Sequence, residues 1–282
     1  MVGVGGHAGS PPQGYSPKEL CRVGAELLAC KDTAVLDAQL LLCHVLECNR
    51  IDIVTNPNMI ISELQKNCYM DYVKKRANGV PLEHITGSKE FMSLPFFVNQ
   101  HVLIPRPDTE TLVERVMENV KSGRILEIGT GSGCIAVSLA KYLPNVTIDA
   151  IDISVEALDV ARRNAATNGV SVNFIQKDVM EDFDGMYDAV VSNPPYIESD
   201  TIAGLMPEVQ KEPLIALDGG IDGLDFYRRI ISGNFLKPGG YIAFEVGHNQ
   251  AKAVMDMMGE FNKVSAWQDL SGISRVVDGV KS

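Results

Sequence analysis

The sequence has no apolar run long enough to cross a membrane, and it is poor in positive charge. Its richest apolar segment, residues 38–46, is short and contains Gln39 and His44, whereas a membrane span needs roughly 18 uninterrupted apolar residues. Of the 282 residues, 25 are Lys or Arg and 36 are Asp or Glu, which gives a formal net charge of −11. These features exclude a membrane-spanning protein and argue against a broad basic surface that grips nucleic acid backbones.

Cysteine is also sparse and has no metal-binding or disulfide spacing. The chain contains 6 Cys residues, and none of them forms a C-x-x-C pair. Small disulfide scaffolds and zinc sites both need regular or paired cysteines, so we expect a reducing, cytoplasmic compartment. Cys43 and Cys48 lie in an apolar helical run, where buried core thiols are expected. The first 14 residues are rich in Gly and Pro, contain no Arg and lack the apolar core of a secretion signal. They predict a disordered tail rather than a targeting segment.

Residues 15–82 have the pattern of a small helical domain. Ser16 and Glu19 form a predicted capping box, with Pro17 at the first helical position. Apolar periodicity then predicts helices over residues 17–30, 33–46 and 61–78. Residues 83–105 change to short aromatic and β-branched pieces separated by Gly87 and Pro95, which predicts a β-hairpin linker.

Residues 106–282 alternate between strand-like and helical patterns. Helices are predicted at 134–142 and 155–168. Strands are predicted at 124–128, 147–151, 172–175, 188–192, 241–246, 263–268 and 274–277. Alternating strands and helices imply right-handed crossovers and a mostly parallel sheet covered on both faces. The fold class is therefore α/β.

A glycine-rich turn follows the first of these strands. Gly129, Gly131 and Gly133 are separated by Thr130 and Ser132, directly before a predicted helix. Glycines allow a sharp turn and a close approach of the backbone to a ligand, and the helix terminus offers unpaired amides. The spacing differs from the G-x-G-x-x-G of a dinucleotide site.

Two carboxylates accompany this turn. Asp152 ends the second strand about twenty residues later, where it can accept hydrogen bonds from both hydroxyls of a ribose. Glu127 lies two residues before the first glycine, and together with the glycine spacing it favours S-adenosylmethionine over a nicotinamide dinucleotide. The alternative is a turn whose glycines only permit close packing of helix and strand.

The fourth strand leads into Asn193-Pro194-Pro195-Tyr196. Two prolines cannot continue a strand, so a rigid polar turn is expected at the carboxyl edge of the sheet. The Asn193 side-chain oxygen and the Pro194 carbonyl could together accept both N–H bonds of an amide or an exocyclic amine, and Tyr196 could cover its flat face. A structural turn is the alternative.

These motifs together resemble the peptide chain release factor glutamine N5-methyltransferases. The resemblance rests on the Asn193 turn, the Gly129 loop and three further segments. These are Ile104-Pro105-Arg106-Pro107-Asp108-Thr109-Glu110, Phe244-Glu245-Val246-Gly247 and Asp37-Ala38-Gln39-Leu40-Leu41-Leu42. The Asn-Pro-Pro-Tyr turn is shared with adenine-N6 methyltransferases, whereas the segment around Arg106 is more specific. The resemblance to the glutamine N5-methyltransferases extends over nearly the whole chain after the tail.

The resemblance implies a class I S-adenosylmethionine-dependent methyltransferase with a seven-stranded Rossmann-like sheet and an N-terminal helical domain that helps to recognise the release factor. It implies methylation of the glutamine in the release factor's Gly-Gly-Gln loop, with S-adenosylhomocysteine as product. The implied cofactor-binding residues are Glu127, Gly129, Thr130, Gly131, Ser132, Gly133, Asp152, Asp178, Val179 and Asn193. Asn193, Pro194 and Tyr196 are the implied catalytic residues, and with Pro195 they would hold the substrate amide. No metal and no nucleic acid partner is expected.

Two questions stay open at this stage. An adenine-N6 methyltransferase acting on DNA or RNA would share the site, but it should carry a basic recognition region. Arg106 could steer an acidic group or brace the catalytic loop, or it could pair with Asp108 or Glu110.

Overall fold

The computed structural model describes residues 14–181, 185–269 and 271–282. The predicted tail lies outside this range, apart from Gly14. The chain divides into two compact units, with the boundary between Thr86 and Gly87.

The first unit consists of helices, as predicted. The capping box is present, because the Ser16 Oγ accepts from the Glu19 N–H (3.3 Å) and the Ser16 N–H donates to the Glu19 carboxylate (3.1 Å). Helix α4 begins at Glu63, later than predicted, because a second capping box forms between Ser62 and Gln65. The helices are α1 (Pro17–Leu27), α2 (Ala34–Leu46), α3 (Arg50–Thr55), α4 (Glu63–Ala77) and α5 (Leu82–Thr86).

An apolar core and one buried ion pair hold these helices together. Leu41 and Leu42 of α2 pack with Tyr69 and Val73 of α4 and are fully buried. Within the same interface the Arg76 Nε donates to the Asp37 carboxylate at 2.6 Å, and both side chains are buried. Removing one partner of such a pair would leave an uncompensated buried charge, so this pair fixes how α2 packs on α4.

The second unit begins with the predicted β-hairpin. Strands β1 (Ser88–Phe91) and β2 (Leu94–Phe97) pair antiparallel, and Met92 and Ser93 make the turn with positive φ angles of 50° and 57°. Phe91 and Phe96 point from the hairpin into the core that covers one face of the main sheet. The hairpin is therefore packed as part of this unit.

The main sheet has seven strands and is mostly parallel, as predicted. Its order is β5-β4-β3-β6-β7-β9-β8, and only the pairs β7–β9 and β8–β9 are antiparallel. The strands are β3 (Gly123–Ile128), β4 (Val146–Asp152), β5 (Asn173–Gln176), β6 (Tyr187–Ser192), β7 (Leu236–Glu245), β8 (Phe261–Gln268) and β9 (Ser274–Lys281).

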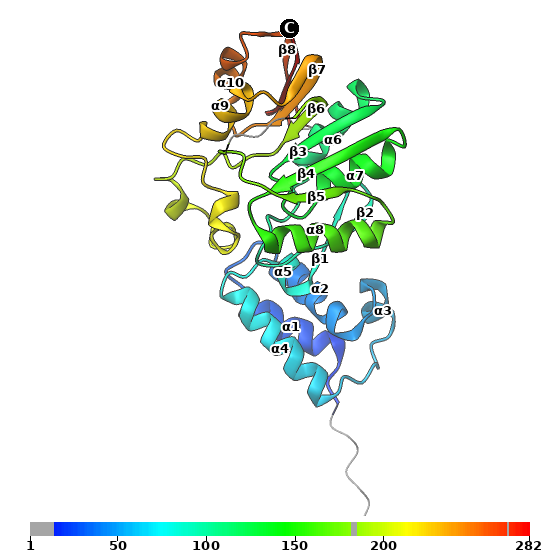
Figure 1. Ribbon diagram of the computed structural model, residues 1–282. Helices are drawn as coiled ribbons and strands as arrows, with labels where there is room; N and C mark the ends of the chain where they lie inside the picture. Colours follow the sequence, from blue (N-terminus) through cyan, green and yellow to red (C-terminus); the bar gives the residue numbers. More distant parts are fainter. Residues whose placement is uncertain (1–13, 182–184, 270) are drawn as a thin grey trace, which may run out of the picture. The chain divides into compact units, whose positions relative to one another are not determined.

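Helices cover both faces of this sheet (Figure 1). Successive residues of one strand point to opposite faces of the sheet. Ile125 packs in the core on one face, beneath α6 (Asp108–Asn119), α7 (Cys134–Tyr142) and α8 (Val155–Asn168). Leu126 packs in the core on the other face, beneath α9 (Asp225–Ser232) and α10 (Ala251–Met257). Three short 3₁₀ turns, η1 (Ile202–Gly204), η2 (Val209–Lys211) and η3 (Leu214–Ala216), follow β6. No helix in the described ranges is both long and apolar enough to span a bilayer.

The strand order determines where a ligand can bind. The chain builds β3, β4 and β5 outward in one direction and then returns to place β6 on the other side of β3. Open α/β sheets bind ligands at this kind of switch point, outside the carboxyl ends of the strands. The glycine loop follows β3 and the Asn193 turn follows β6, so the topology brings the two predicted motifs to one crevice.

Candidate active site

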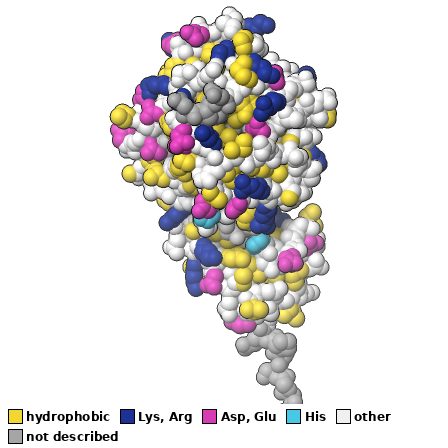
Figure 2. Space-filling view, viewed as in Figure 1, with side chains coloured by type: hydrophobic (Ala, Val, Ile, Leu, Met, Phe, Trp, Pro, Cys, Tyr) yellow, Lys and Arg dark blue, Asp and Glu magenta, His cyan; other side chains and the backbone are white. Residues whose placement is uncertain are grey.

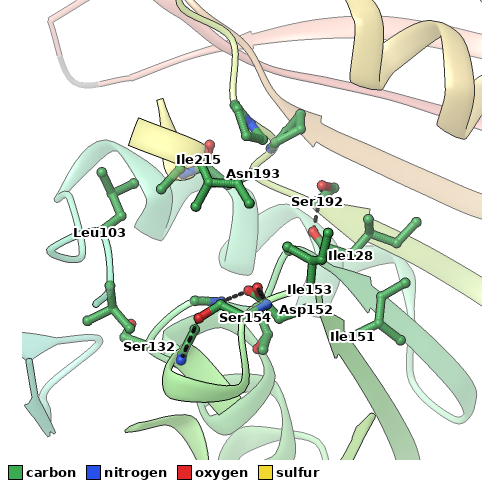
Figure 3. Close-up of a pocket in the computed structure, with 18 of the residues that line it drawn as sticks. Leu103, Ile128, Ser132, Ile151, Asp152, Ile153, Ser154, Ser192, Asn193 and Ile215 are labelled. Carbon is green, nitrogen blue, oxygen red and sulfur yellow. Dashed lines mark hydrogen bonds between the residues drawn. The ribbon is translucent and has the colours of Figure 1, made fainter. Parts of the chain in front are cut away.

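A cavity of about 250 Å³ opens at this switch point. Its walls come from the segment before α6, the glycine loop, the end of β4, the turn after β5, the Asn193 turn and η3. Figure 3 shows Asp152 and Ser154 on one side of the cavity, and Asn193 and Ile215 on another. Residues far apart in the sequence therefore share one site.

The three glycines of the loop have two different structural roles. Gly129 (φ +74°) and Gly131 (φ +53°) line the cavity, and a Cβ at either position would have no atom within 4 Å. Gly133 (φ +78°) does not line the cavity, and a Cβ there would lie 3.0 Å from the Ala161 Cβ of α8. The first two glycines therefore leave open space for a ligand, while the third allows α7 and α8 to pack closely.

Asp152 faces both the loop and the cavity. Its Oδ2 accepts from the Gly131 N–H (2.8 Å) and its Oδ1 accepts from the Ser154 N–H (2.9 Å), the second of which is visible in Figure 3. Burial raises the pKa of this carboxyl, although these backbone N–H groups oppose the shift. A carboxylate has about four acceptor positions, so Asp152 can hold the loop and still accept from a ligand hydroxyl.

Glu127 lies beneath the loop and does not line the cavity. One of its oxygens, Oε2, accepts from the Thr130 hydroxyl (2.6 Å) and from the Ala136 N–H (3.1 Å). Burial raises the pKa of Glu127 to about 8. The family resemblance implied that Glu127 binds the cofactor. In the structure its carboxylate holds the glycine loop to the start of α7.

The turn after β5 contributes Asp178 and Val179 to the cavity wall. The Asp178 carboxylate accepts from the Met180 N–H (2.8 Å), and the Val179 carbonyl accepts from the Arg229 Nε (2.7 Å). These contacts fix the backbone of the turn, as expected for the edge of a binding site.

The Asn193 turn is held against the centre of the sheet. The Ser192 hydroxyl donates to the Ile128 carbonyl (2.7 Å), which joins the ends of β6 and β3 (Figure 3). The Asn193 Nδ2 donates to the Thr109 hydroxyl (3.4 Å). Pro194 and Pro195 also line the cavity.

Tyr196, by contrast, is absent from the cavity wall. Its carbonyl accepts from the Gln250 Nε2 (2.9 Å), and its ring lies against Gly247, where a Cβ would come within 3.0 Å of the Tyr196 Cδ2. Burial raises its pKa to about 12. Phe226 of α9 contributes a phenyl ring to the wall, and no sequence motif had indicated this residue.

Arg106 pairs with neither of the acidic residues next to it in the motif. Its Nη2 lies 2.5 Å from the Glu212 Oε1, and Glu212, whose side chain is 1% exposed, also accepts from the Ile104 N–H. Asp108 pairs with Arg275, and Glu110 accepts from the Met92 N–H. Arg106 therefore braces the loop after β6, one of the roles left open by the sequence.

Comparisons with known proteins agree with this architecture. The model for the PrmC N-terminal domain matches residues 19–87, and the model for the methyltransferase small domain matches residues 106–208. A crystal structure of a methyltransferase from Pyrococcus furiosus shares the fold, with a TM-score of 0.52 and 17% identity over 69% of this chain and 92% of that one.

Curated relatives match nearly the whole chain. The release factor glutamine methyltransferase of Clostridium acetobutylicum is 41% identical over 87% of this chain and 90% of its own length. The protein of the same name from Thermodesulfovibrio yellowstonii is 39% identical over 86% of this chain and 91% of its own. The chain is therefore an S-adenosylmethionine-dependent methyltransferase that belongs to the release factor glutamine methyltransferase family.

Proposed function

We propose that this enzyme transfers a methyl group from S-adenosylmethionine to the side-chain amide nitrogen, N5, of the glutamine in the Gly-Gly-Gln loop of a peptide chain release factor. The observation that carries the proposal is that Asn193 and Pro194 line the same cavity as the glycine loop. The turn that would hold the substrate amide and the glycine loop that would bind the cofactor then line the same cavity.

The cavity has the features that S-adenosylmethionine requires. Gly129 and Gly131 leave room for a ligand next to their backbone, and Asp152 offers carboxylate oxygens for a ribose. Asp178 and Val179 would border the adenine, with Thr130 and Ser132 completing the wall. Glu127 and Gly133 would act on the cofactor through the loop they support.

When bound, S-adenosylmethionine supplies an electrophilic methyl group on a sulfonium. The residues of this chain then have to position an amide whose nitrogen lone pair is delocalised. The Asn193 side-chain oxygen and the Pro194 carbonyl would accept its two N–H bonds, and this interaction strengthens as the nitrogen becomes cationic. Orientation of this kind contributes on the order of 7–11 kcal/mol to a bimolecular step.

Three features support a release factor as the substrate. The relatives that match most of the chain are named for this reaction. The loop after β6 carries exposed apolar side chains, with Leu214 60% and Ile215 53% exposed, and Ile215 also lines the cavity. Such residues suit contact with a protein. On the face of the second unit shown in Figure 2, basic side chains are interspersed with acidic and apolar ones, unlike a continuous phosphate-binding surface.

The N-terminal helical unit would contribute to holding the release factor, and the cytoplasm, where translation ends, would be the place of action. The domain division proposed from the sequence is a tail at 1–14, a recognition domain at 15–82, a hairpin linker at 83–105 and a catalytic domain at 106–282.

A methyl-transfer assay with radiolabelled S-adenosylmethionine tests the proposal. The acceptors are a release factor, the same factor with its Gly-Gly-Gln glutamine replaced by alanine, and duplex DNA. We expect label only on the unmodified release factor. Label on DNA adenine at a comparable rate, with none on the release factor, would favour the adenine-N6 methyltransferase instead.

A further inference from the structure

A buried asparagine of α8 joins the glycine loop to the β-hairpin. Asn164 is 0% exposed. Its Nδ2 donates to the Ser132 carbonyl of the glycine loop (2.9 Å) and to the Phe97 carbonyl at the end of β2 (2.9 Å). Its Oδ1 accepts from the Phe97 N–H (2.7 Å). A single side chain therefore holds together two segments that are far apart in the sequence.

The three bonds use both kinds of polar group that an asparagine carries. Its amide has two N–H donors and one oxygen acceptor. At Asn164 both donors bond to carbonyls and the oxygen bonds to an N–H. An ionised aspartate could accept but not donate, and a leucine could do neither. Burying a polar side chain costs free energy unless it is bonded, whereas a fully bonded one makes its surroundings rigid.

The bond to Ser132 fixes one peptide group of the glycine loop. The carbonyl of the Ser132–Gly133 peptide accepts from Asn164, and the N–H of the same peptide donates to the Thr130 carbonyl (2.8 Å). A peptide group is planar, so bonds at both of its ends determine its orientation. Thr130 and Ser132 line the cavity, and the surface that the loop offers to a ligand therefore depends on Asn164.

The bonds to Phe97 fix the start of a second cavity wall. In an antiparallel pair of strands only alternate residues exchange both backbone bonds with the partner strand, and Phe97 instead gives its N–H and its carbonyl to Asn164. Beyond Phe97 the chain runs along α8, where Val102 is 1% exposed and packs against apolar side chains of this helix. It then reaches the cavity, which Leu103 and Pro105 line.

We propose that Asn164 is a positioning residue for S-adenosylmethionine. It fixes the glycine loop relative to the wall that contains Leu103 and Pro105, and this arrangement sets the affinity for the cofactor. Asn164 does not line the cavity, so it acts through Ser132 and Phe97. The inference concerns cofactor binding, and it holds whichever acceptor the enzyme methylates.

The same helix offers a matched control. Asn168 is also buried on α8, one turn after Asn164. Its Nδ2 donates to the Pro95 carbonyl of the hairpin (3.0 Å) and to the Asn164 carbonyl (2.9 Å). Among the described residues its side chain makes no hydrogen bond to the glycine loop. Asn168→Ala therefore removes a buried amide that bonds to the hairpin and leaves the bond to Ser132 in place.

Calorimetric titration of the cofactor compares Asn164→Ala with Asn168→Ala. Both variants should be less stable than the wild type, since each loses buried hydrogen bonds. The Kd for S-adenosylmethionine should rise on the order of 10-fold in Asn164→Ala, as when outer hydrogen-bond partners of a binding site are lost, and should stay close to the wild-type value in Asn168→Ala. A loss of stability alone leaves the Kd of a protein that remains folded unchanged. A folded Asn164→Ala protein with wild-type Kd, or equal rises in the two variants, would overturn the proposal.

Hydrogen exchange in the wild-type protein tests the same connection without any variant, and so decides the question even if Asn164→Ala does not fold. Phe97 does not line the cavity, and its N–H bonds to Asn164. Saturating S-adenosylmethionine should slow exchange of the Phe97 amide together with the amides of the glycine loop, because a held loop opens less often. The Met92 amide, which donates to Glu110 in the same hairpin, is the control and should change less. Slower exchange in the loop with no change at Phe97, or equal slowing at Phe97 and Met92, would contradict the proposal.

Discussion

Asp152 accepts two backbone N–H groups, one from Gly131 and one from Ser154, and it also lines the cavity. The sequence predicted its position at a strand end but not the bond to the glycine loop. That bond depends on the register of β3 and β4, which places Ile128 beside Ile151. The carboxylate therefore has a structural and a proposed binding role.

Replacing Asp152 by alanine should weaken the binding of S-adenosylmethionine by roughly 1.5–3 kcal/mol, the contribution of a hydrogen bond to a charged group. Isothermal titration calorimetry measures this directly. Asp256→Ala is the matched control, because Asp256 is exposed on α10 and pairs with Lys252, far from any cavity residue in the sequence. A folded Asp152→Ala protein with wild-type affinity would disprove the ribose assignment.

Glu127 gives a prediction for stability against pH. Its pKa is raised by burial from 4.5 to about 8, so between these values the folded protein binds one more proton than the unfolded chain. Stability should therefore decrease as the pH rises from about 4.5 to about 8. We expect Glu127→Gln to remove this loss and to be the more stable protein at pH 8 by at least about 1 kcal/mol.

Urea unfolding at pH 5 and at pH 8 checks this expectation, with wild type and variant compared at each pH. The difference between the two proteins should grow toward pH 8. A difference that is the same at both pH values would show that the Glu127 carboxyl is not forced toward its neutral form by burial.

At the scale of helices and strands, the sequence predicted those features that depend only on neighbouring residues. The Ser16 capping box, the alternating strands and the glycine turn all have short-range causes, and the structure confirms them. Helices α3, α5, α6 and α9 were not predicted, and α5 occupies the start of the predicted hairpin linker. At α3, Asn49 and Asp52 form a capping box of the same kind, but six residues are too few for apolar periodicity to be visible.

Long-range contacts could not be predicted in this way. The partner of Arg106 is Glu212, 106 residues later, and no spacing rule connects the two. Phe226 lines the cavity from α9, whereas Tyr196 does not line it and its carbonyl accepts from Gln250. These placements follow from packing across the sheet, which the local sequence does not encode.

Three alanine variants test the two roles of the loop glycines, with Gly169 at the end of α8 as the control. Gly169 ends α8 with φ +67°, and its Cβ would meet nothing within 4 Å, so Gly169→Ala measures left-handed strain alone, about 1–3 kcal/mol. Gly133→Ala should cost more stability than Gly169→Ala because of the contact with Ala161. Gly129→Ala should cost about as much as Gly169→Ala but should also impair the binding of S-adenosylmethionine.

Denaturant unfolding and calorimetric titration separate these effects. Normal cofactor affinity in Gly129→Ala would show that the open space at this glycine is not used by the ligand. Equal losses of stability in Gly133→Ala and Gly169→Ala would show that α7 and α8 tolerate the added Cβ.

On the scale of the whole molecule, the two units have separate cores, and the cavity is built from the second unit only. A fragment of residues 87–282 should therefore fold and bind S-adenosylmethionine with nearly unchanged affinity. If the helical unit helps to hold the partner, kcat/KM for an intact release factor should fall tenfold or more, about 1.4 kcal/mol.

A short peptide containing Gly-Gly-Gln is the matched control for this fragment, because it is too small to contact a second unit extensively. The fragment and the full chain should methylate the peptide at similar rates. Equal kcat/KM values on the intact release factor would argue against a recognition role for the helices.

The central claim is that the acceptor is a glutamine amide held by Asn193. Tandem mass spectrometry of a release factor incubated with S-adenosylmethionine and either wild-type enzyme or Asn193→Ala tests it most directly. The account predicts a single added methyl group on the side-chain nitrogen of the Gly-Gly-Gln glutamine with the wild type, and none or very little with the variant at equal cofactor occupancy. A methyl group at any other residue, or equal modification by the two proteins, would contradict it.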